Sequence, residues 1–198
     1  MDKQVSRKYF NKKAKQWDET IRNNDAKKLK ALADRLCIPG QAWILDVGTG
    51  TGVFLPYLKK RVNHNSRVIC MDFAFYMLVQ AKSKNGASSV DYICAEIESL
   101  RFSNELFDVV MCYSTFPHFH DKPSALLTIH QLLKPGGSLY IGHTASRETI
   151  NSIHRAIPDF QDHLIPDKNE MESLFQQAGF SEFDIIESAD SYLAAARK

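Results

Sequence analysis

ILDVGTGTG, residues 44–52, carries an apolar run typical of a buried β-strand directly into three glycines at alternate positions. Glycines permit a tight turn, and without Cβ atoms they let a ligand approach the main chain closely. The residues that follow, Val53, Phe54 and Leu55, predict a helix whose first N–H groups have no partner inside the helix. The stretch therefore predicts a strand–turn–helix unit with a ligand at the turn.

Short β-type runs alternate with helical patterns from Trp43 onward, which is typical of a parallel sheet with crossover helices. The predicted strands are 43–47, 67–71, 90–94, 107–112, 138–142, 182–188 and 191–195. The gap between the last two is too short for a crossover, so we expect these two strands to pair antiparallel. The sequence thus predicts an α/β fold with a mostly parallel sheet.

Three of the predicted helices have recognisable N-caps at Asp121, Ser146 and Asp167. The first of these is expected to stop at 135–137 (Pro-Gly-Gly), and the third at Gly179. Helical spacing also predicts two helices before the first strand. The expected apolar faces are Val5, Tyr9, Phe10, Ala14, Trp17 and Ile21; Leu29, Leu32, Ala33 and Leu36; Leu126, Leu127, His130 and Leu133; and Met171, Leu174 and Phe175.

Length and composition predict one domain with a continuous core, since the chain has 198 residues of which 44% are apolar. The net charge of +2 favours no particular partner, but residues 1–30 alone carry +6. Such a basic arm is either a solvated helix face or a contact for an anionic substrate, a membrane surface or nucleic acid.

The cysteines, Cys37, Cys70, Cys94 and Cys112, form no CxxC pair, and the last three fall in apolar runs. Buried free thiols in a reducing compartment explain them better than disulfides or a metal site. The first residues lack an apolar signal-peptide core, and no run reaches the length of a membrane span. We therefore expect a cytoplasmic protein.

Three details around the glycine turn narrow the expected ligand. The spacing is GxGxG, not the GxGxxG that brings a helix onto a pyrophosphate. Asp46 precedes the turn, where a carboxylate suits a cationic amine. Asp72 ends the next strand about 20 residues later, where an acidic residue can bind both ribose hydroxyls. An amino acid joined to an adenosine without phosphates meets all three conditions, and the alternative is a purely structural turn.

These features resemble the class I S-adenosylmethionine-dependent methyltransferases of type 11, similar to those of ubiquinone and menaquinone biosynthesis, over nearly the whole chain. ILDVGTGTG resembles the first family motif, and Phe107–Val110 and Leu133–Gly137 resemble later ones. Residues 94–102 resemble the family's GDAExLPF segment but depart from it at Ala95-Glu96 and Arg101. FNKKAKQWD, residues 10–18, resembles the FxxxAxxYD helix that closes over the cofactor, with Trp17 replacing the tyrosine.

The resemblance implies a Rossmann-like, doubly wound, seven-stranded sheet of order 3-2-1-4-5-7-6, and methyl transfer to a small-molecule acceptor. It implies one domain, 1–198, with N-terminal helices (1–37) as a lid or appendage and the sheet with its crossover helices in 43–198. S-adenosylmethionine would be the cofactor and S-adenosylhomocysteine the product. The expected cofactor-binding residues are Trp17, Asp46, Val47, Gly48, Thr49, Gly50, Gly52, Asp72, Phe73, Met77, Glu96, Ile97, Cys112 and Tyr113.

Chemistry is expected where strands 107–112 and 138–142 end, because ligands of open α/β sheets bind beyond the carboxyl ends of the strands. Methyl transfer needs a base only if the acceptor must lose a proton. His118 and His143 are the best candidates, with Tyr113 third. The alternative for each histidine is a hydrogen bond to a loop backbone.

No metal is expected, although His118, His120, His143, His154 and His163 share one half of the chain, because no HxxxH or CxxC pattern accompanies them. We expect His154 on a helix face, packed by Ile150, Ile153 and Ile157.

Aromatic residues near the predicted site are expected to line the core or the pocket: Phe73, Phe75, Tyr76, Phe116 and Phe119. Residues 113–116, Tyr-Ser-Thr-Phe, stand where nucleic-acid amino methyltransferases of the family usually have Asn/Asp-Pro-Pro-Tyr, which disfavours base methylation. A non-catalytic S-adenosylmethionine-binding or regulatory protein and, less so, an NAD-dependent oxidoreductase are the alternatives. The acceptor, the methylated atom and the oligomeric state stay open.

Overall fold

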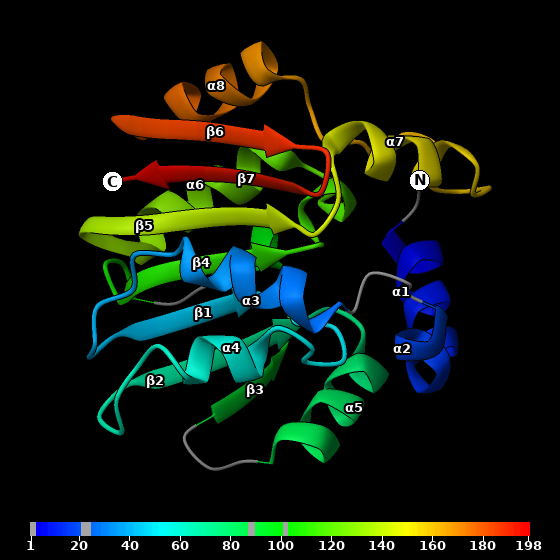
Figure 1. Ribbon diagram of the computed structural model, residues 1–198, viewed down its shortest axis with the longest axis horizontal. Helices are drawn as coiled ribbons and strands as arrows, with labels where there is room; N and C mark the ends of the chain where they lie inside the picture. Colours follow the sequence, from blue (N-terminus) through cyan, green and yellow to red (C-terminus); the bar gives the residue numbers. More distant parts are fainter. Residues whose placement is uncertain (1–2, 21–24, 87–89, 101–102) are drawn as a thin grey trace.

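The computed structural model describes residues 3–20, 25–86, 90–100 and 103–198. Seven strands form one sheet in the order β3-β2-β1-β4-β5-β7-β6 (Figure 1). β7 is antiparallel to both β5 and β6, and the other neighbouring pairs are parallel, so the predicted order and direction are confirmed. The strands are β1 (Trp43–Val47), β2 (Arg67–Asp72), β3 (Val90–Cys94), β4 (Phe107–Tyr113), β5 (Leu133–His143), β6 (Glu182–Ser188) and β7 (Ser191–Arg197).

Helices cover both faces of the sheet. Alternate residues of a strand point to opposite faces, so Ile44 packs with the layer of α3 and α4 while Leu45 packs with the layer of α6 and α8. The helices are α1 (Lys3–Lys13), α2 (Trp17–Thr20), α3 (Ala26–Asp34), α4 (Leu55–Lys59), α5 (Phe75–Asn85), α6 (Lys122–Leu132), α7 (Arg147–Arg155) and α8 (Lys168–Gln177), with short 3-10 turns η1 (Ala14–Gln16), η2 (Ile97–Ser99) and η3 (Phe116–His118).

The three predicted N-caps are confirmed. The Asp121 carboxylate accepts from the Ser124 N–H at 3.0 Å, and Ser146 and Asp167 cap α7 and α8 in the same way. These caps satisfy N–H groups that the first turn of a helix leaves without partners. Each cap sets where its helix begins, and α7 thereby starts after only three residues beyond the end of β5.

The end of α6 differs from the prediction. α6 stops at Leu132, before the expected stop at 135–137, and β5 begins at Leu133, five residues earlier than predicted. Leu133 is buried and pairs with Phe107, and the pairing of β4 with β5 then shifts its register before Val109. The Pro-Gly-Gly sequence therefore forms an irregularity within a strand.

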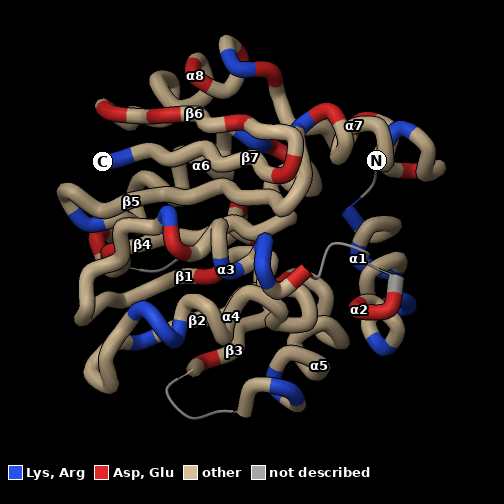
Figure 2. The backbone as a smooth tube through the Cα atoms, viewed as in Figure 1, with Lys and Arg blue, Asp and Glu red and all other residues tan. Residues whose placement is uncertain are grey.

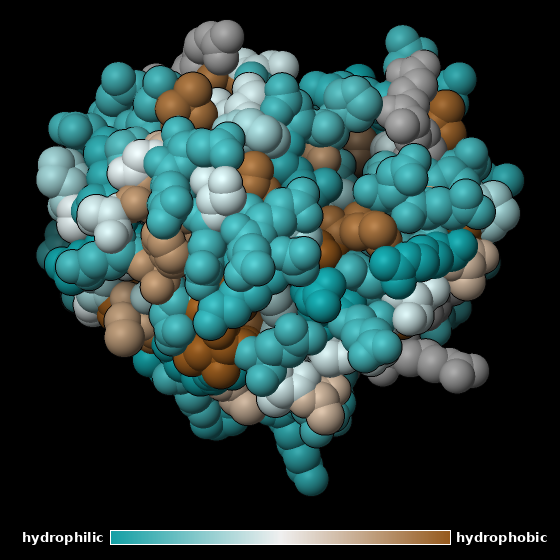
Figure 3. Space-filling view, turned by 90° about the horizontal axis from the view of Figure 1, so that it is seen from above, coloured by the Kyte–Doolittle hydropathy of each residue, from teal (hydrophilic) through white to brown (hydrophobic). Residues whose placement is uncertain are grey.

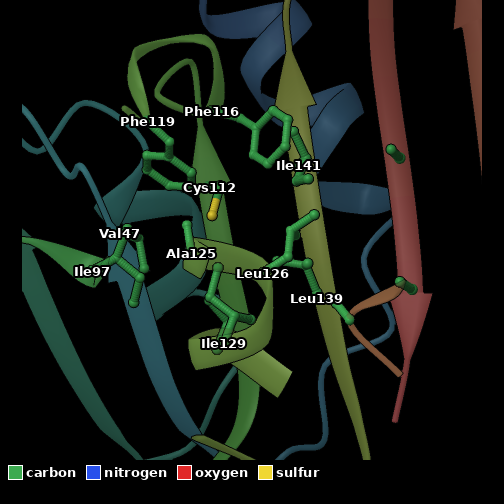
Figure 4. Close-up of a cluster of buried hydrophobic side chains, with 14 of the residues drawn as sticks. Val47, Ile97, Cys112, Phe116, Phe119, Ala125, Leu126, Ile129, Leu139 and Ile141 are labelled. Atoms are coloured by element: carbon green, nitrogen blue, oxygen red, sulfur yellow. The ribbon is translucent and has the colours of Figure 1, made fainter. Parts of the chain in front are cut away.

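α6 packs on the sheet through a narrower apolar face than the sequence indicated. Ala125, Leu126 and Ile129 point toward Cys112 of β4 and Leu139 of β5 (Figure 4). Leu127, predicted to be on this face, is 48% exposed. It follows Leu126 by 100° around the helix and therefore points away from the sheet.

The N-terminal segment lies across the carboxyl ends of the central strands (Figure 1). Phe10 and Ala14 are buried against Met77 of α5 and Phe160, as the predicted face requires, whereas Val5 is 41% exposed and was wrongly placed on it. Ile21, the last member of that predicted face, lies outside the described residues. The predicted face of the second helix, α3, is confirmed for Leu29, Leu32 and Ala33, and Leu36 is buried with them although it follows the end of α3.

All four cysteines are free, but only Cys70 and Cys112 are buried. The expected burial is wrong for Cys37 and Cys94, and Cys94 is exposed because it ends β3, an edge strand. Within the described part of the chain, no helix is long and apolar enough to cross a membrane.

Two adjacent leucines of α6 provide a matched test of this packing. We expect Leu126→Ala to lower the free energy of unfolding by about 2–5 kcal/mol, because it leaves a cavity in the core. Leu127→Ala should change it by less than about 0.5 kcal/mol, since the side chain is already half in water. Urea unfolding of both variants measures the difference, and equal losses would contradict the observed orientation of α6.

Candidate functional site

A cavity of about 420 Å³ lies at the carboxyl ends of the strands. Its walls come from the glycine turn after β1, the residues after β2 and β4, helices α1 and α7, and Phe160. Seen from above, the surface is mostly hydrophilic, with a few hydrophobic residues exposed between the hydrophilic ones (Figure 3). The volume is within the range of small-molecule and cofactor sites.

The turn after β1 keeps its backbone open to this cavity. Gly48 and Gly50 have φ of +65° and +56°, a left-handed conformation that L side chains rarely adopt. A Cβ on Gly48 would lie 1.9 Å from Thr115 Oγ1, so this glycine also permits the close approach of the loop after β4. A Cβ on Gly50 would meet only the Gly48 carbonyl oxygen at 4.0 Å. The main chain at Gly50 is therefore accessible to a ligand.

Asp72 ends β2 and lines the cavity next to this turn. Its Oδ2 accepts from the Gly50 N–H at 2.9 Å, and its Oδ1 accepts from the Ala74 N–H at 2.8 Å. Each carboxylate oxygen can accept a second hydrogen bond. Burial raises the pKa of Asp72 to about 6, while the backbone N–H donors oppose the shift. The carboxylate is thus held rigidly and retains acceptor capacity.

Asp46 lies beneath the turn and is not among the residues that line the cavity. Its Oδ2 accepts from the Thr49 hydroxyl at 2.5 Å, and its buried Oδ1 has no hydrogen-bond partner within the described chain. Burial raises the pKa of this carboxyl to about 7, and the nearby charge of Asp72 adds to the shift. Asp46 therefore supports the turn through Thr49.

Some of the other predicted cofactor residues line a second, smaller hollow, two lie away from both hollows, and the rest line the main cavity. A smaller hollow of about 50 Å³ shares Gly48, Asp72 and Phe73 with the main cavity and adds Val47, Glu96 and Ile97. Gly52 faces Ala81 and Asn85 of α5, and Cys112 lies in the core. The members of the predicted set that line the main cavity are Trp17, Gly48, Thr49, Gly50, Asp72, Phe73, Met77 and Tyr113.

Polar contacts hold α1 and α2 in place beside the cavity. Glu96 forms ion pairs with Lys3 Nζ at 3.0 Å and with the Arg7 guanidinium. Asp18 of α2 accepts from the Thr51 hydroxyl and pairs with Lys84 of α5. These contacts hold Phe10 and Trp17 over the turn.

Two of the three candidate bases, His143 and Tyr113, line the cavity and have few hydrogen-bond partners. His143 is 1% exposed and lines the cavity, and neither of its ring nitrogens has a hydrogen-bond partner in the described chain. Burial lowers its pKa to about 3, so the ring is neutral at pH 7. Tyr113 also lines the cavity, but its hydroxyl is hydrogen-bonded to Thr144 at 3.0 Å, and burial raises its pKa.

His118 belongs to a group of three imidazoles. Its Nδ1 lies 2.9 Å from His163 Nδ1, and His154 Nδ1 is hydrogen-bonded to the His163 carbonyl oxygen. Burial and the neighbouring histidines lower the pKa of His118 well below its usual value. Across the described ranges, no group of three or more His, Cys, Asp or Glu side chains is arranged to hold a metal ion.

Some aromatic and aliphatic residues are not where the sequence indicated. Phe75 and Tyr76, expected in the core or pocket, are 57% and 58% exposed at the start of α5. Ile150, Ile153 and Ile157, expected only to pack His154, line the cavity with it. Their spacing of three and four residues was the available signal for a pocket wall. Tyr9 and Phe160 also line the cavity and were not predicted.

Comparison with known proteins finds a family model described as "Methyltransferase domain", which matches residues 45–141. The ubiquinone/menaquinone biosynthesis C-methyltransferase UbiE of Vibrio campbellii is 31% identical over 137 residues, covering 67% of this chain and 52% of that protein. The malonyl-[acyl-carrier protein] O-methyltransferase of Acetivibrio thermocellus is 29% identical over 156 residues, covering 78% and 54%. The chain thus spans about half the length of these curated relatives.

Solved structures share the fold over nearly the whole chain. A methyltransferase in complex with the Haloferax volcanii Trm112 activator has a TM-score of 0.79 at 18% identity, with 95% of this chain and 96% of that chain covered. A SAM-dependent methyltransferase from Aquifex aeolicus has a TM-score of 0.74 at 22% identity, with 94% and 97% covered.

The raised pKa of Asp46 predicts a specific dependence of stability on pH. Between about pH 4 and pH 7, Asp46 keeps its proton in the folded chain but loses it in the unfolded chain, so the folded chain becomes less stable as pH rises. Asp46→Asn removes this titration and keeps an oxygen for the Thr49 hydroxyl. Over this range, the free energy of unfolding of the variant should fall less steeply with pH than that of the wild-type chain. The two slopes should differ by up to about 1.4 kcal/mol per pH unit. Parallel curves for the two proteins in urea unfolding would contradict the prediction.

Proposed function

The chain belongs to the type 11 methyltransferase family, and from this premise we propose that it transfers a methyl group from S-adenosylmethionine to an uncharged small molecule. The observation that carries the proposal is one continuous cavity with two unlike parts. One part has an open glycine backbone and the fixed carboxylate of Asp72, and the other has aliphatic side chains and the neutral ring of His143. The relatives are methyltransferases, so the alternative of an NAD-dependent oxidoreductase is not favoured.

The first part of the cavity has groups that fit the donor. Asp72 would bind the ribose hydroxyls, since both its oxygens are oriented by backbone N–H groups and can each accept another hydrogen bond. The adjoining hollow with Glu96 and Ile97 would hold the adenine. The open main chain at Gly50 would receive the methionine end, and Asp46 would act indirectly by holding Thr49.

S-adenosylmethionine, when bound, supplies a methyl group already activated by a positively charged sulfur. The protein's own contribution is then alignment of the reactants and exclusion of water. Phe10 and Trp17 would exclude water, since α1 is held over the turn by the pairs of Lys3 and Arg7 with Glu96. We also propose a single domain in which α1 and α2 form the cover and α3 belongs to the sheet layers.

The second part of the cavity suits an acceptor without charge. Ile150, Ile153 and Ile157 form an aliphatic wall, and Lys13 and Asp72 are the charged residues among the described lining at pH 7. His143 would hydrogen-bond a hydroxyl or N–H of the acceptor and take its proton where the reaction requires it. His118 is less suited, because its Nδ1 is shared with His163.

The donor site is tested by replacing Asp72. We expect Asp72→Ala to raise the Kd for S-adenosylmethionine on the order of a hundredfold, because two charge-assisted hydrogen bonds are lost. Asp91→Ala, on the neighbouring strand and exposed, is the matched control and should leave the Kd unchanged. Isothermal titration calorimetry measures both, and an unchanged Kd in the Asp72 variant would overturn this assignment.

His143 is tested by an apolar residue of similar shape. His143→Phe removes the polar atoms without leaving a protein group unpaired, since neither ring nitrogen has a partner in the described chain. Thermal stability and donor affinity should therefore stay the same, while turnover to S-adenosylhomocysteine over an acceptor library falls at least about tenfold. His64→Phe, on the exposed loop before β2, is the control. Equal turnover in the two variants would exclude His143 from acceptor binding.

A further inference from the structure

The outer surface of α1 is basic and without partners. Residues 3–16 contain six Lys or Arg and no Asp or Glu. Lys3 and Arg7 pair with Glu96, but Lys8, Lys12 and Lys15 are exposed and have no ion-pair or hydrogen-bond partner in the described chain. Their spacing of four and three residues puts them on one side of α1 and of η1, the turn that continues it. Figure 2 shows basic positions recurring along this segment.

Exposed apolar side chains gather around the same helix. Of the seven large hydrophobic residues exposed in the described chain, five lie on α1, α5 and α7, which each contribute side chains to the cavity lining. The remaining two, Leu127 and Ile186, lie apart on α6 and β6. The five are Val5, Phe75, Tyr76, Val79 and Ile153. An apolar group of this kind on one side of a protein indicates an interaction site.

The lysines and the aromatic rings belong to one surface. The Tyr76 N–H donates to Asn11 Oδ1 of α1 at 2.9 Å, which joins the start of α5 to α1. Lys8 and Lys15 lie about one helical turn on either side of Asn11. We call this surface, made by Val5, Lys8, Lys12, Lys15, Phe75, Tyr76 and Val79, the basic–apolar face.

We propose that the basic–apolar face docks on the surface of an anionic lipid bilayer. Unpaired lysines are attracted to anionic headgroups, and exposed aromatic and aliphatic side chains gain by entering the interface. Val5 and Val79 add aliphatic surface beside the two aromatic rings, and aliphatic side chains favour lipid over stacked nucleobases. A docked bilayer would lie beside the cavity, because Ile153 is both exposed and part of its lining.

This inference goes beyond methyl transfer, and only one consequence rests on the proposed function. An apolar acceptor dissolved in the bilayer would reach the aliphatic wall of the cavity without crossing bulk water. Membrane binding is measurable without donor, acceptor or turnover, so its failure and the failure of the proposed function are distinguishable.

The test is cosedimentation of the full chain with vesicles. We expect binding to vesicles of roughly 70% phosphatidylcholine and 30% phosphatidylglycerol, weakening as salt is raised, and far less binding to phosphatidylcholine alone. The triple variant Lys8→Glu/Lys12→Glu/Lys15→Glu should lower the partition coefficient at least about tenfold. Lys27→Glu/Lys59→Glu/Lys60→Glu changes the net charge equally on other elements and should lower it far less.

A second pair of variants tests the apolar part of the face. Phe75→Ser/Tyr76→Ser should lower the partition coefficient several-fold, whereas Leu127→Ser/Ile186→Ser, at exposed positions elsewhere, should not. Circular dichroism melting establishes that each variant is folded. Equal losses in the test and control variants would overturn the proposal. So would the absence of wild-type binding to anionic vesicles, or salt-sensitive retention on RNA or DNA in its place.

Discussion

The carboxylate of Asp72 joins the two loops on which the site depends. It accepts one N–H from the turn after β1 and another from the start of α5, so it holds Gly50 in its left-handed conformation and fixes where α5 begins. α5 in turn carries Met77, against which Phe10 and Ala14 pack. The N-terminal cover is thus positioned, through α5, by one buried acidic group. Burial of this group costs free energy, and the two N–H donors offset part of that cost.

A parallel sheet explains why residues so distant in sequence meet here. β1, β2, β4 and β5 end at the same edge, so Gly48, Asp72, Tyr113 and His143 come together although they span almost a hundred residues. These strand ends differ in what they contribute to the cavity. The turn after β1 presents open backbone, and β2 ends in a carboxylate, whereas β4 and β5 end in a phenol and an imidazole. The helix that follows β5, α7, adds Ile150 and Ile153, so the cavity has a polar part and an aliphatic part.

Strong local signals in the sequence made much of the fold and part of the site predictable. Apolar runs, N-caps and the GxGxG spacing identified the strands, three helix starts and the turn with Asp72 beside it. The predictions of burial were wrong where neighbouring residues are alike in sequence and only tertiary packing decides which of them is buried. Leu126 and Leu127 are alike in sequence, and only the direction of α6 buries one of them. Phe75 and Tyr76 were expected inside because the family resemblance assigns their region to the cofactor and pocket, and the pocket wall of α7 was interpreted as ordinary packing. Asp46 accepts from the Thr49 hydroxyl beneath the turn, and its expected contact with a ligand stays a prediction.

The strand order leaves β3 and β6 at the two margins of the sheet. Backbone groups along an outer strand are open to pairing with a strand of another molecule. β6 carries Glu182, Asp184 and Glu187 as exposed residues, and β3 carries the exposed Asp91. Adding an identical strand beside β6 would bring like charges together and desolvate them. The acidic margin therefore acts against aggregation through strand addition.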